Sequence, residues 1–348
     1  MRKHNNRVTI KDIACKAGVS KTTVSFAFNS PEKISKATHR KIMQIAQAEG
    51  YAPNPVARTL ATNRIGTIGI LLPQGVEFML RNPYISEFLQ GVGLCVSRRG
   101  LSITIVSPVN GSLAGAVNTA AADGFICVGL EQNMEPFKIL RARGVPFVTV
   151  DVPTDDDVPC VVSDDRDGCR MMMKAVVDAG HRDVAIIGVK PPYQYNESKT
   201  SLTSQNRLAG YLDALESSGI PRESVPVYSS HTTIEDGFCT AQWIFSTANP
   251  PGAIVCMSDI TALGVIRYCT EHGIAVPDDV SVCGFDNIQL SAYTHPALTT
   301  VSQNIPEKGR TAAALLLSIL DRKNVPLHRT VPTHTVIRQT LSRTKHTV

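Results

Sequence analysis

The chain has 348 residues, 43% of them hydrophobic, and a formal net charge of +5. That length allows two or three domains with sizeable cores, and that apolar content is typical of a soluble globular protein. No run reaches the roughly 18 apolar residues of a membrane span, and the basic N-terminus is not followed by the apolar segment of a secretory signal. We therefore expect a cytoplasmic protein without a membrane partner.

Positive charge is concentrated near the N-terminus. Residues 1–64 contain twelve Lys and Arg against three Asp and Glu, a formal charge of +9, whereas residues 65–348 have a formal charge of −4. A basic head on a mildly acidic body is typical of a protein that binds a polyanion such as nucleic acid. A basic disordered tail is the alternative, and the helical periodicity of the apolar residues in the head argues against it.

The nine cysteines and nine histidines are dispersed along the chain. No two cysteines form a C-x-x-C pair, and no histidines follow the H-x-x-x-H or H-E-x-x-H spacing of a metal site. Scattered cysteines inside apolar runs are typical of reduced core residues. We expect neither a metal nor another cofactor.

The first helix is predicted over "IKDIACKAG". Thr9 can cap it, and Asp12 three residues later completes a capping-box-like arrangement. Gly18 suits the left-handed turn that ends a helix, because it lacks a Cβ. Ser20 caps a second helix, and a third helix over "SKATHRKIMQIAQAEG" is capped by Ser35 and stopped at Gly50.

The second helix separates two kinds of side chain. Its inward residues are predicted to be Thr23, Val24, Ala27 and Phe28, and its outward residues are Lys21, Thr22, Ser25 and Phe26. Two short helices followed by a supporting third form a helix-turn-helix, whose second helix enters the major groove of DNA.

The strings "VTIKDIACKAGVSKTTVSFAFN" and "GYAPNPVARTLATNRIGTIGILLP" resemble the lactose-repressor family of bacterial transcription regulators. The likeness continues through the C-terminal body and covers nearly the whole chain. It implies a dimer that binds a double-stranded, pseudo-palindromic operator and responds to a small-molecule effector. The chain ends without a heptad of leucines, which favours a dimer over a tetramer.

The resemblance also implies a set of DNA contacts. The segment "NPVARTLAT" matches a hinge that becomes helical on the operator and inserts Leu60 into the minor groove, where such a wedge unstacks a base step. Arg58 and Arg64 are either phosphate partners or solvated linker charges, and Leu60 packing on the body is the alternative to the wedge. The predicted DNA-binding residues are Thr9, Ser20, Lys21, Thr22, Thr23, Ser25, Phe26, Asn29, Ala57, Arg58 and Leu60.

Phe26 is the unusual member of this set. Several relatives place arginine or another polar residue at the matching position. Arginine would select guanine, whereas a phenylalanine ring contacts a thymine methyl group. We predict thymine opposite Phe26 in each half-site and a guanine or phosphate contact for Lys21; the alternative is that Phe26 turns inward beside Phe28.

From Ile65 onward, short apolar runs alternate with helical segments. This pattern predicts parallel sheets covered on both faces, arranged as two doubly wound subdomains with the chain crossing between them. These two subdomains resemble the periplasmic sugar-binding fold that the family uses as its sensor, so the resemblance implies an N-terminal all-α helix-turn-helix domain plus a periplasmic-binding-protein-like α/β sensor. The expected bounds are 1–50 for the headpiece, 51–64 for the hinge and 65–348 for the sensor. The predicted strands lie in "IGTIGILLP", "SITIVSP", "GFICVGL", "PFVTVDV", "DVAIIGV", "GAIVCMS" and "VSVCGFD".

Ligands of such sheets bind outside the carboxyl ends of the strands. Arg207 and Asp286 match the family's ligand-binding arginine and acidic residue, and we expect them on facing walls of a cleft, where they hold hydroxyl groups or a polar ring. An ion pair between the domains is the alternative. Asp259, Tyr84 and Asp165 are further effector-binding candidates, although Asp259 could instead cap a helix that starts at Thr261.

The loop "SSHTTIEDG" departs from the family. Many relatives place an aromatic residue there to stack on the ligand, whereas this chain has His231, Thr232 and Thr233. A standard sugar or purine is therefore less expected. Tyr193 and Tyr195 either replace the missing ring or are ordinary loop tyrosines.

The leading hypothesis is a ligand-responsive transcriptional regulator, and we expect a repressor. The ligand either releases DNA or promotes its binding. A solute-binding protein for a transporter fits the body, but not the basic head or the absent secretory signal. An enzyme is disfavoured because there is no G-x-S-x-G, no P-loop and no G-x-G-x-x-G after a strand.

Overall fold

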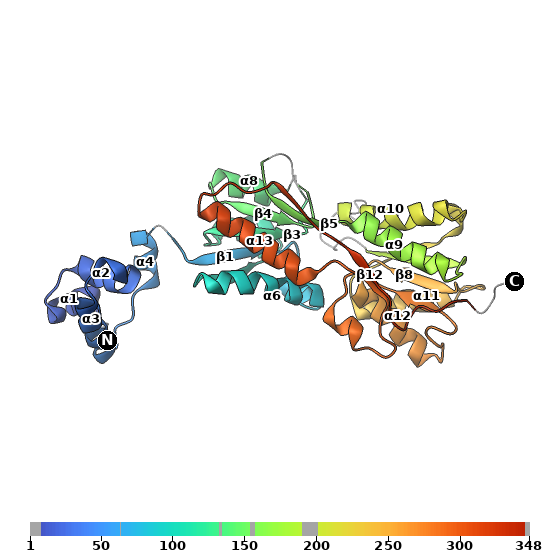
Figure 1. Ribbon diagram of the computed structural model, residues 1–348, viewed down its shortest axis with the longest axis horizontal. Helices are drawn as coiled ribbons and strands as arrows, with labels where there is room; N and C mark the ends of the chain where they lie inside the picture. The colour runs from blue at the N-terminus through green and yellow to red at the C-terminus, as the bar shows by residue number, and fades with distance from the viewer. Residues whose placement is uncertain (1–7, 63, 132–133, 154–156, 190–200, 345–348) are drawn as a thin grey trace. The chain divides into compact units, whose positions relative to one another are not determined.

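The computed structural model describes residues 8–62, 64–131, 134–153, 157–189 and 201–344. The chain divides into two compact units, Met1–Ile65 and Gly66–Val348. The first unit is helical and the second contains the sheets (Figure 1). None of the described helices is both long enough and apolar enough to span a lipid bilayer.

Three helices form the core of the first unit, which we call the headpiece. Helix α1 packs against α2 and α3 through buried Ile13, Ala17, Val24, Ala27 and Ile42. The fourth helix lies in the segment predicted as the hinge. The headpiece elements are α1 (Ile10–Ala17), α2 (Lys21–Asn29), the 3-10 turn η1 (Pro31–Lys33), α3 (Lys36–Ala48) and α4 (Pro55–Thr62).

The predicted capping residues are confirmed. The Asp12 carboxylate accepts hydrogen bonds from the backbone N–H and the hydroxyl of Thr9, at 2.9 and 2.7 Å. Gly18 ends α1 with a φ of 68° in the left-handed region. Ser20 and Ser35 each accept a backbone N–H in the first turn of α2 and α3.

The second unit, which we call the body, contains two parallel sheets. The first has the order β11-β5-β4-β3-β1-β2, and the second has the order β7-β6-β8-β9. The first sheet comprises β1 (Thr67–Leu71), β2 (Ser102–Val106), β3 (Gly124–Val128), β4 (Phe147–Val150), β5 (Cys160–Ser163) and β11 (His328–Val331). The second comprises β6 (Val184–Val189), β7 (Val227–Ser230), β8 (Ala253–Cys256) and β9 (Ser281–Cys283).

All seven predicted strands are present, as β1, β2, β3, β4, β6, β8 and β9. The prediction missed β5, β7 and β11, along with the antiparallel pair β10 (Thr300–Ser302) and β12 (His334–Val336). These strands are only three or four residues long, and β7 and β11 are mostly exposed edge strands. Segments this short carry little apolar periodicity, which is why the pattern did not reveal them.

Helices cover both faces of each sheet. In the first subdomain α6 (Pro83–Arg98) packs against α13 (Ile305–Leu320), and α7 (Leu113–Thr119) packs against α8 (Glu135–Ala142). In the second subdomain α9 (Asp165–Asp178) packs against α10 (Leu202–Ser217), and α11 (Ile234–Phe245) packs against α12 (Asp259–Glu271). The remaining short helices are α5 (Val76–Met79), η2 (Arg222–Ser224) and η3 (Gln289–Ala292).

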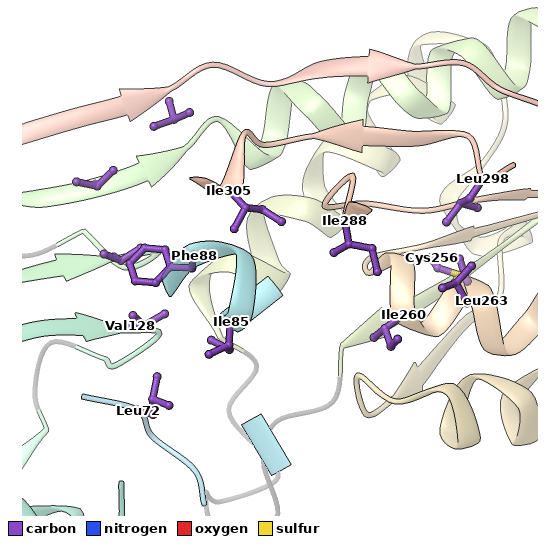
Figure 2. Packing of buried hydrophobic residues seen from close by; sticks show 14 of the residues in the cluster. Leu72, Ile85, Phe88, Val128, Cys256, Ile260, Leu263, Ile288, Leu298 and Ile305 are labelled. Carbon is purple, nitrogen blue, oxygen red and sulfur yellow. The ribbon is translucent and has the colours of Figure 1, made fainter. Parts of the chain in front are cut away.

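The chain passes between the subdomains after β5, after β10 and after β11. One cluster of buried apolar side chains continues across this junction. In Figure 2, Ile305 lies near Ile85 and Phe88 of the first subdomain, and Ile288 lies toward Ile260 of the second. The crossing segments are therefore part of the core rather than loose linkers.

Helices α6 and α13 approach each other closely at two glycines. A Cβ added at Gly91 would lie 2.0 Å from the carbonyl oxygen of Pro306, and one added at Gly309 would lie 2.2 Å from that of Phe88. Neither distance is possible for a real Cβ, so any larger residue would push the helices apart. The two helices form a tightly matched pair that fixes the side chains they carry.

Candidate functional site

The DNA-facing candidates divide into residues that cap helices and residues that point outward. Ser20 Oγ lies 3.0 Å from the Thr23 backbone nitrogen and 2.9 Å from the Thr23 hydroxyl, so this pair closes the first turn of α2. The Thr9 side chain is likewise used in the cap of α1. Lys21 and Thr22 are exposed at the start of α2. The cap thus holds the helix end while leaving Lys21 and Thr22 accessible.

The two phenylalanines of α2 occupy different environments. Phe28 packs with the headpiece core, and its ring meets Tyr51 edge-on with centroids 5.6 Å apart. Phe26 is half-buried and is not a member of that cluster among the described residues. The Lys33 ammonium group lies 5.2 Å from the Phe26 ring centroid. This geometry favours the outward orientation of Phe26 over inward packing beside Phe28.

The predicted hinge is helical in the structure. Helix α4 spans Pro55–Thr62 and includes positions 57, 58 and 60 of the predicted DNA-binding set. Leu60 is 82% exposed. An apolar side chain left this accessible on a short helix is available to a partner surface.

At the C-terminal end of α2, Asn29 donates a hydrogen bond to the Ser25 hydroxyl at 3.3 Å.

Four of the five effector candidates, all except Asp259, gather at the junction of the two subdomains. We call this group the polar cluster. Most of its members are buried, and hydrogen bonds link them from one subdomain to the other. The polar cluster consists of Tyr84, Asp151, Ser163, Asp165, Arg207, Ser258, Asp286, Gln303 and Lys308.

Arg207 is the centre of the polar cluster in the second subdomain. Its guanidinium donates to Asp165 Oδ1 at 2.8 Å and to the Met257 carbonyl at 2.5 Å, and it lies 3.5 Å from Asp286 Oδ1. The Phe285 ring supports it from one face, with the guanidinium carbon 3.7 Å from the ring centroid. Burial opposes the charge, but Asp165 and Asp286 outweigh it and raise the pKa of Arg207. Arg207 is thus a fixed cation.

Asp286 follows β9 and is held by donors from two directions. Ser258 donates to Oδ2 at 3.1 Å, and Gln303 donates to Oδ1 at 2.5 Å. Its backbone φ is 125°, a strained value for a residue with a side chain. Burial raises the pKa of Asp286 to about 6, while Arg207 acts to lower it.

The first subdomain contributes the other side of the polar cluster. The Tyr84 hydroxyl, at the start of α6, donates to Asp151 Oδ2 at 2.6 Å. Burial and the adjacent Asp151 carboxylate raise the pKa of Tyr84. The Lys308 ammonium donates to Asp151 Oδ1 at 2.6 Å and to Gln303 Oε1. Ser163 donates to the same Gln303 oxygen at 3.0 Å.

The structure corrects the expected placement of Arg207 and Asp286. The prediction placed them on facing walls, but both belong to the second subdomain, because α10 and the segment after β9 pack on the same sheet. The ion pair they form is therefore internal to that subdomain. The side chains that face them from the first subdomain are Tyr84 and Asp151.

Asp259 does not cap a helix. It is the first residue of α12, which begins two residues earlier than the alternative reading assumed. Its carboxylate accepts the Ile288 N–H at 2.9 Å and the Thr300 hydroxyl. Through the Ile288 contact, the fully buried Asp259 supports the segment that carries Asp286.

Several functional candidates were missed by the sequence analysis. Asp151, Gln303 and Lys308 join the polar cluster, although only Asp151 ends a predicted strand. In the loop "SSHTTIEDG", which departs from the family pattern, His231 is buried and Thr233 caps α11. Tyr193 and Tyr195 lie outside the described residues. Within the described ranges, no group of three or more His, Cys, Asp or Glu side chains could hold a metal ion.

We predict that Asp259 makes the stability of the body depend on pH. Burial, with a further contribution from Asp286, raises the pKa of Asp259 from 3.8 to about 8. A raised folded-state pKa gives stability that is complete below the unfolded value and is lost as pH rises through the folded value. D259N should therefore flatten the fall in unfolding temperature between about pH 5 and about pH 8. Differential scanning fluorimetry across this range measures the slope.

The asparagine can keep both contacts of Asp259, because its oxygen can accept the Ile288 N–H and the Thr300 hydroxyl can rotate to accept from its amide. Asp178, in an exposed pair with Lys174, provides the control, and D178N should keep the wild-type slope. An unchanged slope in D259N would show that Asp259 does not produce the pH dependence.

Comparison with known proteins agrees with this architecture. Residues 9–54 match the family described as bacterial regulatory proteins, lacI family, and residues 173–341 match a periplasmic binding protein-like domain. The HTH-type transcriptional regulator IpsA of Corynebacterium glutamicum is 30% identical over 333 residues, covering 91% of this chain and 92% of IpsA. Sequence similarity therefore extends across both units.

Solved structures show the same fold. A complex of the transcriptional regulator CelR with cellobiose is 25% identical, with a TM-score of 0.70, over 96% of this chain and 100% of that one. The lac repressor dimer bound to operator and an anti-inducer is 24% identical, with a TM-score of 0.80, over 97% and 100% of the two chains. With IpsA similar over nearly its whole length, the chain belongs to the lacI family of bacterial transcriptional regulators.

Proposed function

We propose that the protein acts as a homodimer on a pseudo-palindromic operator, with α2 in the major groove and Leu60 in the minor groove. A small polar effector bound at the polar cluster sets the affinity for DNA. The observation that carries this proposal is that one chain combines the accessible N-terminal end of α2 with a buried polar cluster at a subdomain junction. A regulator of chromosomal genes is expected in the cytoplasm.

The chemistry of the polar cluster favours an uncharged, hydroxyl-rich effector. Arg207 and Lys308 already face three carboxylates, those of Asp151, Asp165 and Asp286. An anionic ligand would have to displace a carboxylate from its cation, whereas hydroxyl groups can both donate and accept in such an array. The cellobiose in the similar CelR structure is a ligand of this chemical class.

Effector binding requires movement of the subdomains. Arg207, Asp286 and Lys308 are all less than a tenth exposed, so a ligand reaches them only when the two subdomains separate. The ligand then selects one arrangement of the subdomains over another. A coupling free energy of about 1–3 kcal/mol would change operator affinity about 5- to 150-fold. Both release of DNA and tighter binding fit this scheme.

Selection from a random DNA library by the purified full-length protein tests the operator part of the proposal. We expect enrichment of one pseudo-palindromic site, and sedimentation of a dimer bound to it. Enrichment of no site would overturn the proposal. A metabolite panel, scored by both thermal stabilisation and a change in affinity for the selected site, then tests the effector part.

We predict that F26A relaxes selectivity at one base pair in each half-site. Loss of the ring removes its contact with a thymine methyl group, so discrimination there should fall about fivefold or more. The dependence of affinity on salt should not change, because no phosphate contact is lost. Fluorescence anisotropy with the selected operator and its single-base variants measures both quantities.

F28A is the matched control for F26A. Phe28 packs against Tyr51 in the headpiece core, so its removal should weaken binding to all sites equally and lower the stability of the headpiece. If F26A instead behaves like F28A, Phe26 packs inside and does not read a base.

A further inference from the structure

Lys308 is a buried cation that the family assignment does not explain. It lies in the first turns of α13 and its side chain is 0% exposed. Full burial of a lysine is rare and costly unless the ammonium group is paired and hydrogen-bonded. The surroundings of Lys308 must therefore satisfy it, and they do so with groups of the polar cluster.

The Lys308 ammonium group is placed between the two halves of the polar cluster. On one side it binds Asp151 Oδ1 at 2.6 Å, and Asp151 in turn accepts the Tyr84 hydroxyl. On the other side it binds Gln303 Oε1, and the Gln303 amide donates to Asp286 at 2.5 Å. The ring of Tyr84 also faces the ammonium group, with its centroid 5.6 Å from the nitrogen.

The contact with Gln303 decides which way that amide points. An amide side chain can present either its oxygen or its nitrogen to a neighbour. Lys308 and Ser163 both donate to the oxygen, so the nitrogen is left to face the Asp286 carboxylate. Without the ammonium group, one of the two donors that fix this orientation is lost.

The position of Lys308 is itself fixed by backbone packing. Gly309, the next residue, brings α13 against the Phe88 carbonyl of α6, and Gly91 receives the Pro306 carbonyl in the same way. Tyr84 lies on α6, so the ammonium group and the Tyr84 hydroxyl are carried by one rigid helix pair. A shift of this helix pair would therefore move contacts of the polar cluster in both subdomains.

We propose that Lys308 is a positioning residue of the effector site, which orients Asp151 and Gln303 and so joins the Tyr84 side of the site to the Asp286 side. The proposal rests on the proposed function in that the polar cluster is where the effector binds. It assigns Lys308 a role in holding the ligand-facing groups in one array, without contact between Lys308 and the ligand.

The charges around Lys308 make this role measurable. Asp151 faces it from the segment after β4, Tyr84 from α6, and Asp286 lies beyond Gln303. Arg207 on α10, Asp165 on α9 and the buried Asp259 of α12 also interact with this set, Asp259 through Asp286. Asp286 is ionised above about pH 6, since burial raises its pKa to that value. Communication between Lys308 and Asp286 should therefore depend on pH.

A double-mutant cycle on the effector-free, full-length protein tests the proposal. The midpoints of urea unfolding are compared for wild type, K308M, D286N and K308M/D286N at about pH 7.5 and about pH 5. At the higher pH, we expect the double variant to lose clearly less than the sum of the two single losses, because each single change leaves the other charge unbalanced. At the lower pH, where Asp286 is protonated, the losses should become additive.

Arg310 supplies the control on the same helix. It is half-exposed and pairs with Glu307, so the R310M/D286N cycle should be additive at both pH values. Should K308M alone fail to fold, the same cycle in a D151N background removes the carboxylate that K308M leaves unpaired. Additive losses for K308M and D286N at both pH values would show that Lys308 is not linked to Asp286, and would overturn the proposal.

The cycle uses no effector, so its outcome is separate from that of the effector screen. A pH-dependent coupling together with a panel in which no metabolite binds would retain the role of Lys308 and reject the polar cluster as an effector site. Additive losses together with a bound metabolite would retain the site and reject the role of Lys308.

Discussion

Replacing Arg207 by leucine is expected to destabilise the body by about 3–5 kcal/mol, because it removes the cation from a buried pair and leaves its carboxylates uncompensated. Arg207 donates to Asp165 and the Met257 carbonyl and lies 3.5 Å from Asp286, and all three side chains are buried. R207K should lose less, since it keeps the charge but not the planar fork that reaches several acceptors. Urea unfolding of the full-length variants measures both losses.

Arg166 is the matched control for this prediction. Arg166 lies on α9, the helix that also carries Asp165, and forms a two-point ion pair with Asp213. The arginine side chain, however, is 60% exposed. Exposed pairs contribute little to stability, so R166L should shift the unfolding midpoint far less than R207L. A further test adds D165N to R207L, which removes one unpaired carboxylate and should restore part of the loss. Equal midpoints for R207L and R166L would contradict the assigned role of the buried pair.

The same contacts explain why Arg207 suits an effector site. Its guanidinium is held by Asp165, by a backbone carbonyl and by the Phe285 ring beneath it, so it needs no ligand to keep its place. A group already oriented loses little entropy when a ligand binds. In the proposed effector site, stability and ligand recognition therefore depend on the same pre-organised contacts.

The family resemblance pointed to Arg207 and Asp286, and Asp165 was a further candidate, but the sequence could not assign these residues to the walls of a cleft. Strand order in a doubly wound sheet depends on which runs pair, and that information is not carried by local periodicity. Only the structure shows that α9, α10 and the segment after β9 are all part of the subdomain built on the second sheet. The error in the facing walls follows directly from that limit.

Lys308 could have been noticed from its position in "IPEKGRTAAALLLSIL". It falls three residues after Ile305 and four before Ala312, on the stripe of the helix that points into the core. A lysine on an apolar stripe indicates a buried partner, but the partner cannot be read from the helix itself. Asp151 and Gln303 come from other elements, and their meeting with Lys308 is a tertiary contact.

In the headpiece, local sequence signals were sufficient to predict the helices but not to settle the orientation of Phe26. Thr9, Gly18 and Ser20 mark helix ends through hydrogen bonds and backbone angles that neighbouring residues determine. Phe26 and Phe28 are both apolar and lie only two positions apart, so hydrophobicity alone does not separate them. The contact between Phe28 and Tyr51, a residue beyond α3, separates them in the structure.

Replacing Leu60 by alanine is expected to weaken operator binding about 10- to 100-fold, as burying a leucine side chain is worth about 1.5–3 kcal/mol. Leu60 is 82% exposed on α4, so its truncation removes little packing from the protein itself. In the proposed complex the side chain enters the minor groove and wedges a base step apart. L60M keeps an apolar wedge of similar size and should bind within about threefold of wild type.

Two readouts distinguish the wedge from a phosphate contact. L60A should reduce the bend of an operator labelled at both ends for energy transfer, while the dependence of affinity on salt stays at the wild-type value. R64M, which removes an exposed charge just after the same helix, should instead lower that salt dependence by about one contact per subunit. If L60A binds and bends the operator as wild type does, the side chain does not act in the groove, and the apolar character of the hinge must be attributed to another partner.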